Sequence, residues 1–319
     1  MDQKTIQDVR ERLRAEVHRV VVGQDAVIDL MAVALLAEGH VLLEGVPGTA
    51  KTLLAQAFAA CLALPFKRIQ FTPDLMPGDV LGTSLYNFAT QQFTLTRGPV
   101  FTEVLLADEV NRTPPKTQAA LLQAMQERAV TLDGRAHELS SAFMVIATQN
   151  PIEQEGTYPL PEAQMDRFLL KIRVGYPSPE EEARILDRMG GEPPPPPRPV
   201  IDVKQILAAR HSVNGIYLDE RIRNYVVDLV HATREPERFG LDVRPLVQYG
   251  ASPRATLALA RGARALAFLE GRAYVTPDDV KTIAPDVFRH RVLLTYEAEA
   301  EGVPVDEIVR RILARVEVP

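Results

Sequence analysis

The chain has 319 residues, 46% of them hydrophobic and 24% charged, which is the composition of a globular protein long enough for two domains. A net charge of −6 argues against a large nucleic-acid-binding surface. The single cysteine excludes an intrachain disulfide, and the six histidines show no metal-binding spacing. The chain starts without an apolar segment, and no apolar run approaches the roughly 18 residues that span a bilayer. We therefore expect a cytoplasmic protein without a membrane span.

Short apolar runs alternate with helical patterns from about residue 20 to residue 175. Strands that alternate with helices predict an α/β fold, with a parallel sheet covered on both faces. A nucleotide bound to such a sheet lies beyond the carboxyl ends of the strands. The five predicted strands are Val41–Leu43, Arg68–Phe71, Val104–Ala107, Phe143–Ala147 and Leu169–Val174, and two of the predicted helices are Thr52–Leu62 and Lys116–Arg128.

A glycine-rich loop follows the first predicted strand and is typical of a phosphate-binding P-loop. Its backbone N–H groups and the next helix N-terminus would hold phosphates, Lys51 would reach the β- and γ-phosphates, and the Thr52 hydroxyl would bind Mg²⁺. Ala50 stands where the strict motif has glycine; we expect a negative φ at this helix entry, which a methyl group tolerates. The alternative is a structural turn with an incidental lysine. The motif is Gly45-Val46-Pro47-Gly48-Thr49-Ala50-Lys51-Thr52.

Two acidic residues, Asp108 and Glu109, end the apolar strand Val104–Ala107. Asp108 would lie near the Mg²⁺ held by Thr52, and Glu109 could orient or deprotonate a water in line with the γ-phosphate. This Walker B arrangement suits hydrolysis, because water as the acceptor needs its own carboxylate. The alternative is an exposed acidic pair at a strand end.

The following strand leads to Asn150, whose amide could hold the attacking water beside these acids. Asn150 precedes Pro151, and asparagine before proline is also a common turn former. Both interpretations of Asn150 stay open on this evidence alone.

Two predicted hairpins interrupt the alternation of strands and helices. One joins Ala129–Leu132 to Arg135–Leu139 through Asp133-Gly134, and the other joins Leu85–Phe88 to Phe93–Thr96. Such insertions either carry partner or substrate contacts or cover a sheet edge.

Beyond Gly175 we expect no further strands. Three segments begin with a capping residue and then proline, as helices do: Ser178-Pro179, Ser252-Pro253 and Thr276-Pro277. The proline run 193–197, followed by Arg198-Pro199, predicts a stiff linker in preference to an SH3 ligand. The predicted domains are a nucleotide-binding core over residues 1–199 and a helical domain over residues 200–319.

Several sequence blocks together resemble the MoxR family of AAA+ ATPases, over the region from Val22 to Asp279. Ala50 also matches this family, although it departs from the generic motif. The blocks are Gly45–Thr52, Ala107–Arg112, Pro114–Gln118, Ala147–Pro151, Pro161–Phe168 and Gly250–Ala255.

The resemblance implies an AAA+ P-loop core followed by a helical lid domain. It implies that Asn150 is sensor 1, that Arg167 is an arginine finger for the neighbouring subunit's γ-phosphate, and that Arg254 is sensor 2, touching phosphate in its own subunit. For either arginine the alternative is a surface ion pair worth ~0–1 kcal/mol. Val22, Gly23 and Gln24 would pack against adenine.

The same resemblance makes the Asp133-Gly134 hairpin the pre-sensor 1 insertion and residues 71–96 the helix 2 insertion, both facing the pore or partner side of a ring.

The resemblance implies an Mg²⁺-dependent ATPase that forms a homo-oligomeric ring, expected to be a hexamer, and acts on a protein substrate. Family members work with von Willebrand factor A-domain proteins and assist cofactor or metal insertion. One alternative is a nucleic-acid-directed AAA+ motor or a metal-chelatase subunit; the acidic charge counts against nucleic acid. Another is a GTPase switch, but the chain has no Asn/Thr-Lys-x-Asp segment.

Overall fold

The computed structural model describes residues 3–87, 91–151, 156–190 and 194–319. Its centre is a five-stranded parallel sheet with the order β10-β1-β9-β6-β3, which confirms the predicted α/β fold. The first strand, β1, lies between β9 and β10, so the loop that follows it leaves from the interior of the sheet. The strands are β1 (Val41–Glu44), β3 (Phe66–Gln70), β6 (Val104–Asp108), β9 (Met144–Gln149) and β10 (Leu170–Arg173).

Alternate residues of the strands supply two separate hydrophobic layers, as the two-residue period of a strand requires. On one face, Leu43, Leu106 and Ile146 pack with the helices α2 (Asp25–Leu36) and α3 (Lys51–Cys61). On the other face, neighbouring residues such as Leu105 and Val145 pack with α5 (Pro115–Glu127). The sheet is therefore covered by helices on both faces.

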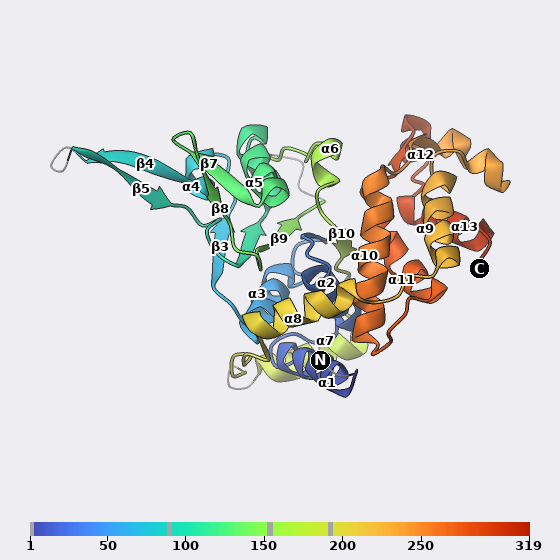
Figure 1. Cartoon of the computed structure of the whole chain (residues 1–319), viewed down its shortest axis with the longest axis horizontal. Helices are drawn as coiled ribbons and strands as arrows, with labels where there is room; N and C mark the ends of the chain where they lie inside the picture. The colour runs from blue at the N-terminus through green and yellow to red at the C-terminus, as the bar shows by residue number, and fades with distance from the viewer. Residues whose placement is uncertain (1–2, 88–90, 152–155, 191–193) are drawn as a thin grey trace.

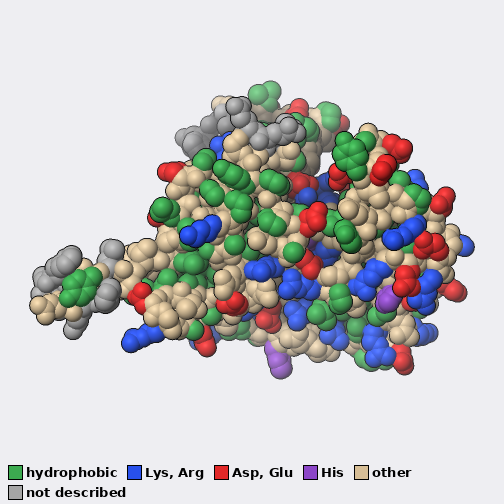
Figure 2. All heavy atoms as spheres, turned by 90° about the horizontal axis from the view of Figure 1, so that it is seen from above, with side chains coloured by type: hydrophobic (Ala, Val, Ile, Leu, Met, Phe, Trp, Pro, Cys, Tyr) green, Lys and Arg blue, Asp and Glu red, His purple; other side chains and the backbone are tan. Residues whose placement is uncertain are grey.

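Both predicted hairpins form. The strands β7 (Ala129–Leu132) and β8 (Arg135–Glu138) join through Asp133 and Gly134, at φ +51° and +72°, the left-handed conformations that a two-residue turn of this kind needs. The short helix α4 (Pro77–Leu81) leads into β4 (Gly82–Asn87) and β5 (Gln92–Arg97); Phe88 lies outside the described residues. Figures 1 and 2 show β4–β5 projecting far from the body of the molecule.

The C-terminal third is mostly helical and lies on the opposite side of the molecule from the β4–β5 hairpin (Figure 1). Ser178, Ser252 and Thr276 cap their helices with side-chain oxygens, as the sequence predicts. The remaining helices are α1 (Gln3–Val17), α6 (Glu162–Met165), α7 (Pro179–Met189), α8 (Val203–Asn214), α9 (Glu220–Ala232), α10 (Pro253–Leu269), α11 (Pro277–Phe288), α12 (Tyr296–Ala300) and α13 (Val305–Arg315), with short 3-10 turns at Val110–Arg112, Pro236–Phe239 and Arg244–Leu246.

The expectation that strands stop after Gly175 is wrong in detail. The strand β11 (Ile201–Asp202) pairs with β2 (Leu62–Ala63), and β12 (Val247–Tyr249) pairs with β13 (Leu293–Leu294). Segments of two or three residues are too short to show an alternating pattern, so the sequence does not reveal them.

The predicted linker has neither helix nor strand over residues 194–199, its described part. Its Arg198 backbone N–H donates to Glu16 Oε2 at 2.8 Å, which holds the linker against α1. The domain boundary at 199/200 stays a prediction, since α8 packs on both α2 and α10. Across the described ranges, no helix combines the length and apolar character that crossing a membrane requires.

Candidate nucleotide-hydrolysis site

The predicted P-loop connects β1 to α3 at the carboxyl end of the sheet. Pro47 and Gly48 form its exposed tip, and Gly48 has φ +85°, which glycine adopts readily. Thr49 is buried, and its hydroxyl donates to the Val46 carbonyl at 2.9 Å. Lys51 Nζ donates to the carbonyls of Gly45 and Val46 at 2.5 and 2.8 Å. The ammonium group therefore lies against the loop, at the N-terminus of α3.

The expected negative φ at Ala50 is wrong. Ala50 has φ +60° and ψ +26°, the left-handed conformation. Its side chain is exposed, so the methyl group has room and the cost lies in the backbone, about 1 kcal/mol for a residue with a Cβ. Glycine would avoid that cost, which explains why the generic motif has glycine here.

Asp108 ends β6 beside the loop and is 3% exposed. Its carboxylate accepts hydrogen bonds from the hydroxyls of Thr52, at 3.0 Å, and Thr148, at 2.7 Å, and pairs with Arg68 at 2.6 Å. A hydroxyl and a carboxylate in contact are the hard oxygen donors that Mg²⁺ prefers, so Thr52 and Asp108 fit this ion. In the described ranges, no group of three or more His, Cys, Asp or Glu side chains could hold a metal by itself.

Several contacts fix both the backbone and the carboxylate of Glu109. It has φ +56°, and its backbone N–H donates to the Thr148 hydroxyl at 2.8 Å. The carboxylate accepts from Gln70 Nε2 at 2.6 Å and pairs with Arg112 at 3.1 Å. The strained backbone is therefore fixed by its neighbours, as is common where geometry serves function.

Asn150 lies between the loop and these acids. It directly follows β9, which pairs with β1 on one side and β6 on the other. The Gly45 N–H donates to the carbonyl of Gln149, the residue before Asn150, at 3.4 Å. Asn150 is 5% exposed, and its backbone carbonyl accepts from Asn111 Nδ2 at 3.3 Å.

The segment Val22–Gln24 reaches the same neighbourhood from the other side. Gly23 has φ +69°, and a Cβ there would lie 2.0 Å from Glu181 Oε1, so a larger residue would carry backbone strain and displace the Glu181 side chain. Gln24 Nε2 donates to the Gly175 carbonyl at 3.2 Å. A Cβ on Gly45 would meet the Val174 carbonyl at 2.5 Å, which places the segment next to the start of the loop.

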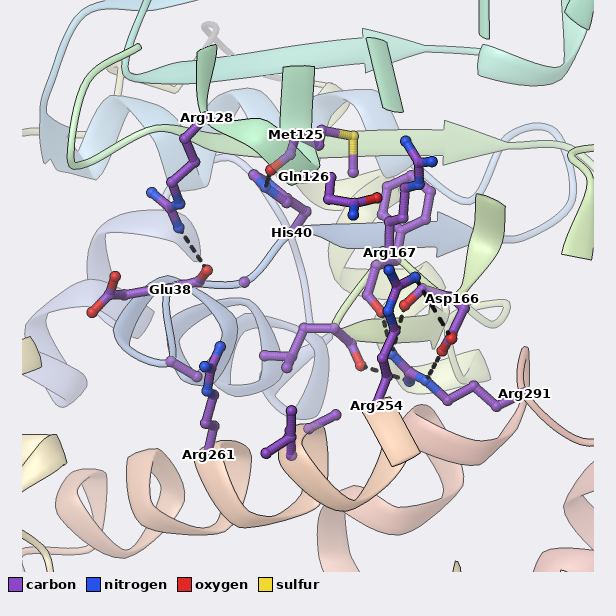
Figure 3. Close-up of a pocket in the computed structure, with 16 residues that line it drawn as sticks. Glu38, His40, Met125, Gln126, Arg128, Asp166, Arg167, Arg254, Arg261 and Arg291 are labelled. Atoms are coloured by element: carbon purple, nitrogen blue, oxygen red, sulfur yellow. Dashed lines mark hydrogen bonds and ion pairs between the residues drawn. The ribbon is translucent and has the colours of Figure 1, made fainter. Parts of the chain in front are cut away.

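A second candidate region lies at the opposite end of the sheet, where β1 and β10 begin (Figure 3). It is a cavity of about 460 Å³ between α10 and the core. None of its described lining residues comes from the loop 45–52. The charged residues that line it are Arg128, Arg167, Arg254, Arg261, Arg291, Glu38 and Asp166.

Asp166 joins the core to the lid within this cavity. Its carboxylate accepts from Arg291 Nε at 2.7 Å and from the Ser252 hydroxyl at 2.8 Å, and it pairs with Arg254 at 3.7 Å. Arg254 therefore lies beside Arg167 and far along the sheet from the loop of its own chain. Arg254 lines a cavity to which the loop 45–52 contributes no described residue, so this placement gives no support to the expectation that Arg254 touches phosphate in its own subunit.

Arg291 fixes the segment that carries Arg167. The guanidinium is 7% exposed and donates to the carbonyls of Phe168 and Leu169 at 2.6 and 3.1 Å. Burial lowers the pKa of Arg291 from its usual value, and the Asp166 carboxylate opposes that shift. The neighbouring His290 Nε2 lies 3.1 Å from the Phe168 carbonyl, and burial holds the pKa of His290 well below its ordinary value.

Known proteins match over nearly the whole chain. The model of the ATPase family associated with various cellular activities (AAA) matches residues 40–170, and that of the AAA lid domain matches residues 241–312. Chaperone MoxR1 of Mycobacterium tuberculosis is 50% identical over 310 residues, which are 97% of this chain and 82% of the relative. Protein MoxR of Methylorubrum extorquens is 33% identical over 98% of this chain and 96% of its own.

The chain belongs to the MoxR family of AAA+ ATPases. A candidate ATPase of Cytophaga hutchinsonii, known from a crystal structure, has the same fold, with a TM-score of 0.91, 43% identity and coverage of 99% of this chain and 97% of that one. The five-stranded sheet and the helical lid are thus those of an AAA+ protein.

The sequence did not reveal three polar residues that complete the acidic end of this AAA+ core. Arg68 and Gln70 lie on β3, where Gln70 pairs in register with Asp108, and the Arg68 guanidinium donates to Gln70 Oε1 at 3.0 Å. Thr148 bridges Asp108 and Glu109 through its hydroxyl. Aligning the carboxyl ends of the predicted strands would have brought Gln70 beside Asp108. The contact between Arg68 and Asp108 depends on the side-chain conformation of Arg68, which no local motif predicts.

Proposed function

We propose that this chain hydrolyses ATP to ADP and phosphate, with Mg²⁺, between neighbouring copies in a ring, and uses the energy to remodel or mature a partner protein. The observation that carries this proposal is the division of the machinery between two ends of the sheet. The loop and the acids lie at one end, and the arginines lie at the other. A second copy that presents its arginine end to the loop would complete the site.

The loop end would bind the nucleotide. Gly45 to Ala50 would surround the phosphates with backbone N–H groups, Lys51 would neutralise charge on the β- and γ-phosphates, and adenine would pack near Val22–Gln24. Thr52 and Asp108 would hold Mg²⁺, which when bound offsets phosphate charge.

Glu109 and Asn150 would prepare the attacking water. Glu109 is the general base or orienting group, and it would first leave the hydrogen bond from Gln70, which now occupies its carboxylate at 2.6 Å. Asn150, buried between the loop and Asp108, would hold the same water through its amide.

Arg167 and Arg254 would act on the neighbouring subunit's γ-phosphate. Phosphoryl transfer leaves little covalent work for the protein, so positive charge placed at the transferred group supplies much of the acceleration. Both arginines line one cavity at the amino end of the sheet, which supports a shared role across the interface. By analogy with AAA+ rings, the assembly would be a hexamer.

The partner would be a protein, and a von Willebrand factor A-domain protein is the expected class. A relative with 50% identity is named a chaperone, which supports work on proteins. The insertion over residues 71–96 exposes large apolar side chains, with Met76 67% and Tyr86 42% exposed, and such side chains suit protein contacts.

The P-loop assignment is tested with Lys51→Ala. Removing the ammonium group leaves the phosphate charge uncompensated, so we expect ATP affinity to fall by at least about 100-fold, the effect of losing one or two charge-assisted hydrogen bonds. Equilibrium binding of a fluorescent ATP analogue measures this change. Affinity equal to that of the wild type would remove the loop from nucleotide binding.

A further inference from the structure

The five arginines of the cavity fall into two groups. Arg291 is fixed by Asp166 and by backbone carbonyls, and Arg128 donates to the carbonyls of Glu38 and Ser141 at 2.8 and 3.3 Å. In the described ranges, the Arg261 side chain has no hydrogen bond or ion pair, Arg167 Nε is buried without a partner, and the Arg254 guanidinium has only the 3.7 Å pair with Asp166. The guanidinium groups of Arg254 and Arg261 are therefore weakly held or unpaired in one cavity, and Arg167 beside them has an unsatisfied Nε–H.

Arg254 and Arg261 belong to the same face of α10. They are seven residues apart, two helical turns, with the exposed Leu257 between them, and all three line the cavity. Figure 3 shows Arg254 and Arg261 rising from α10 into the same space. A rise of 1.5 Å per residue separates their backbones by about 10 Å.

The cavity is larger than a single terminal phosphate requires. Its volume of about 460 Å³ lies within the range of pockets that hold whole small ligands. One arginine finger needs only the γ-phosphate as its partner, whereas a row of arginines along a helix suits an extended polyanion.

We propose that Arg261 is a third arginine for the neighbouring subunit's nucleotide, contacting the α- and β-phosphates while Arg167 and Arg254 reach the γ-phosphate. This inference rests on the proposed hydrolysis between subunits. The charge on the α- and β-phosphates is present before the reaction begins, so a contact there stabilises bound ATP and the transition state alike. Arg261 should therefore affect KM, and Arg167 should affect kcat.

The test measures ATP hydrolysis against ATP concentration for Arg261→Ala, Arg261→Lys and the control Arg223→Ala, at a protein concentration that keeps the wild type assembled. Arg223 is an exposed lid arginine on α9, outside the cavity. We expect Arg261→Ala to raise KM about tenfold with kcat within about twofold, the usual effect of losing one charge-assisted hydrogen bond. Arg261→Lys should raise KM less, because it keeps the charge without the planar fork, and the control should match the wild type.

Two results would overturn the inference. One is an unchanged KM for Arg261→Ala. The other is loss of assembly in the absence of nucleotide, measured by sedimentation velocity, which would show that Arg261 pairs with a neighbouring protein side chain. Arg167→Ala, run in parallel, separates the two proposals: wild-type kcat for Arg167→Ala would reject hydrolysis between subunits itself. An inactive Arg167→Ala together with an unaltered Arg261→Ala would reject only the role of Arg261.

Discussion

The two ends of the strand β1 carry side chains of opposite charge, acidic at the carboxyl end and basic at the amino end. At its carboxyl end, the loop 45–50 lies beside Asp108 and Glu109, and at its amino end a cavity is lined by five arginines. Four residues of strand separate the two ends by about 13 Å, at roughly 3.3 Å per residue. The arginines of one chain therefore lie away from its own phosphate-binding loop. This separation of the loop from the arginines is what supports the proposal that each chain contributes the two ends to two different sites.

Arg167→Ala would test the amino end with the largest expected effect. We expect kcat to fall by about 10³-fold or more, the effect of an arginine finger supplied in trans, while ATP affinity stays within a few-fold of wild type. Steady-state hydrolysis and equilibrium ATP binding measure the two quantities. A fall in affinity with kcat unchanged would assign Arg167 to ground-state binding and contradict its role as the finger.

Glu109→Gln would test the carboxyl end without changing its shape. The amide cannot accept a proton from water, so we expect kcat to fall about 10²–10⁴-fold with ATP still bound. The variant should also hold a partner protein in the ATP state, which affinity capture with and without ATP would detect. Gln70→Ala is the matched control, because it removes the hydrogen bond to Glu109 but leaves the carboxylate in place. Turnover of Glu109→Gln near wild type would remove Glu109 from the chemistry.

His40, at the amino end of the sheet, makes the stability of the fold depend on pH. Its Nδ1 accepts from the Val145 N–H at 2.9 Å, and Nε2 lies 3.2 Å from the Met125 carbonyl, so the ring is neutral with its proton on Nε2. Burial, together with the charge of Arg128, lowers the pKa of His40 to about 3. In the unfolded chain, His40 takes up a second proton, on Nδ1, below pH ~6.5, whereas in the folded chain it does so only near pH 3. The contribution of neutral His40 to stability is therefore complete above pH ~6.5 and is lost as the pH falls toward 3.

The expected loss from His40 at pH 5 is about 2 kcal/mol of unfolding free energy, from 1.36 kcal/mol for each pH unit below 6.5. Urea denaturation at pH 7, 6 and 5 measures this loss together with that of His290, whose pKa burial also holds low and which adds in the same direction. His211→Gln, a substitution at an exposed helix position, should leave the pH dependence unchanged. A free energy of unfolding that does not fall between pH 6.5 and 5 would contradict a neutral His40.

Ala50→Gly has the smallest expected effect and refines the description of the loop. Glycine adopts φ +60° without steric cost, so we expect the free energy of unfolding to rise by up to about 1 kcal/mol. Ala60→Gly is the control with the opposite sign, because Ala60 is exposed near the end of α3 and glycine there should destabilise by up to about 1 kcal/mol. Chemical denaturation of both variants gives the comparison. If both variants were destabilised, Ala50 would not be in the left-handed conformation.

Much of the carboxyl end could be predicted from the sequence, because the relevant geometry is local. A strand, a glycine-rich turn and a helix follow one another in the chain, and the carboxyl ends of parallel strands meet at one edge of the sheet. Thr52 and Asp108 are therefore in contact, as the motif predicts. The φ of Ala50 could not be predicted, since the loop closes on itself through contacts of Lys51 with two carbonyls.

The arrangement of the amino end could not be predicted, because it depends on packing between distant segments. Arg291 donates to the carbonyls of Phe168 and Leu169, which lie more than 120 residues earlier in the chain. Every residue has a backbone carbonyl, so the sequence does not show which carbonyls an arginine will contact. Arg254 and Arg261 reach the cavity because α10 packs beside the amino end of the sheet. The resemblance to the family pointed to Arg167 and Arg254 but not to their shared cavity.

The most direct test of the central claim is to mix Arg167→Ala and Lys51→Ala subunits. The first keeps the loop, the second keeps the arginines, and each alone should be inactive. If hydrolysis occurs between neighbouring copies, a Lys51→Ala subunit completes the site of an adjacent Arg167→Ala subunit, and the mixture regains part of the wild-type rate. The double variant, mixed with either, should restore nothing. The contradicting result is a mixture whose hydrolysis rate stays at the sum of the rates of the two separate variants, although sedimentation shows assemblies that contain both. Hydrolysis would then not occur between neighbouring copies.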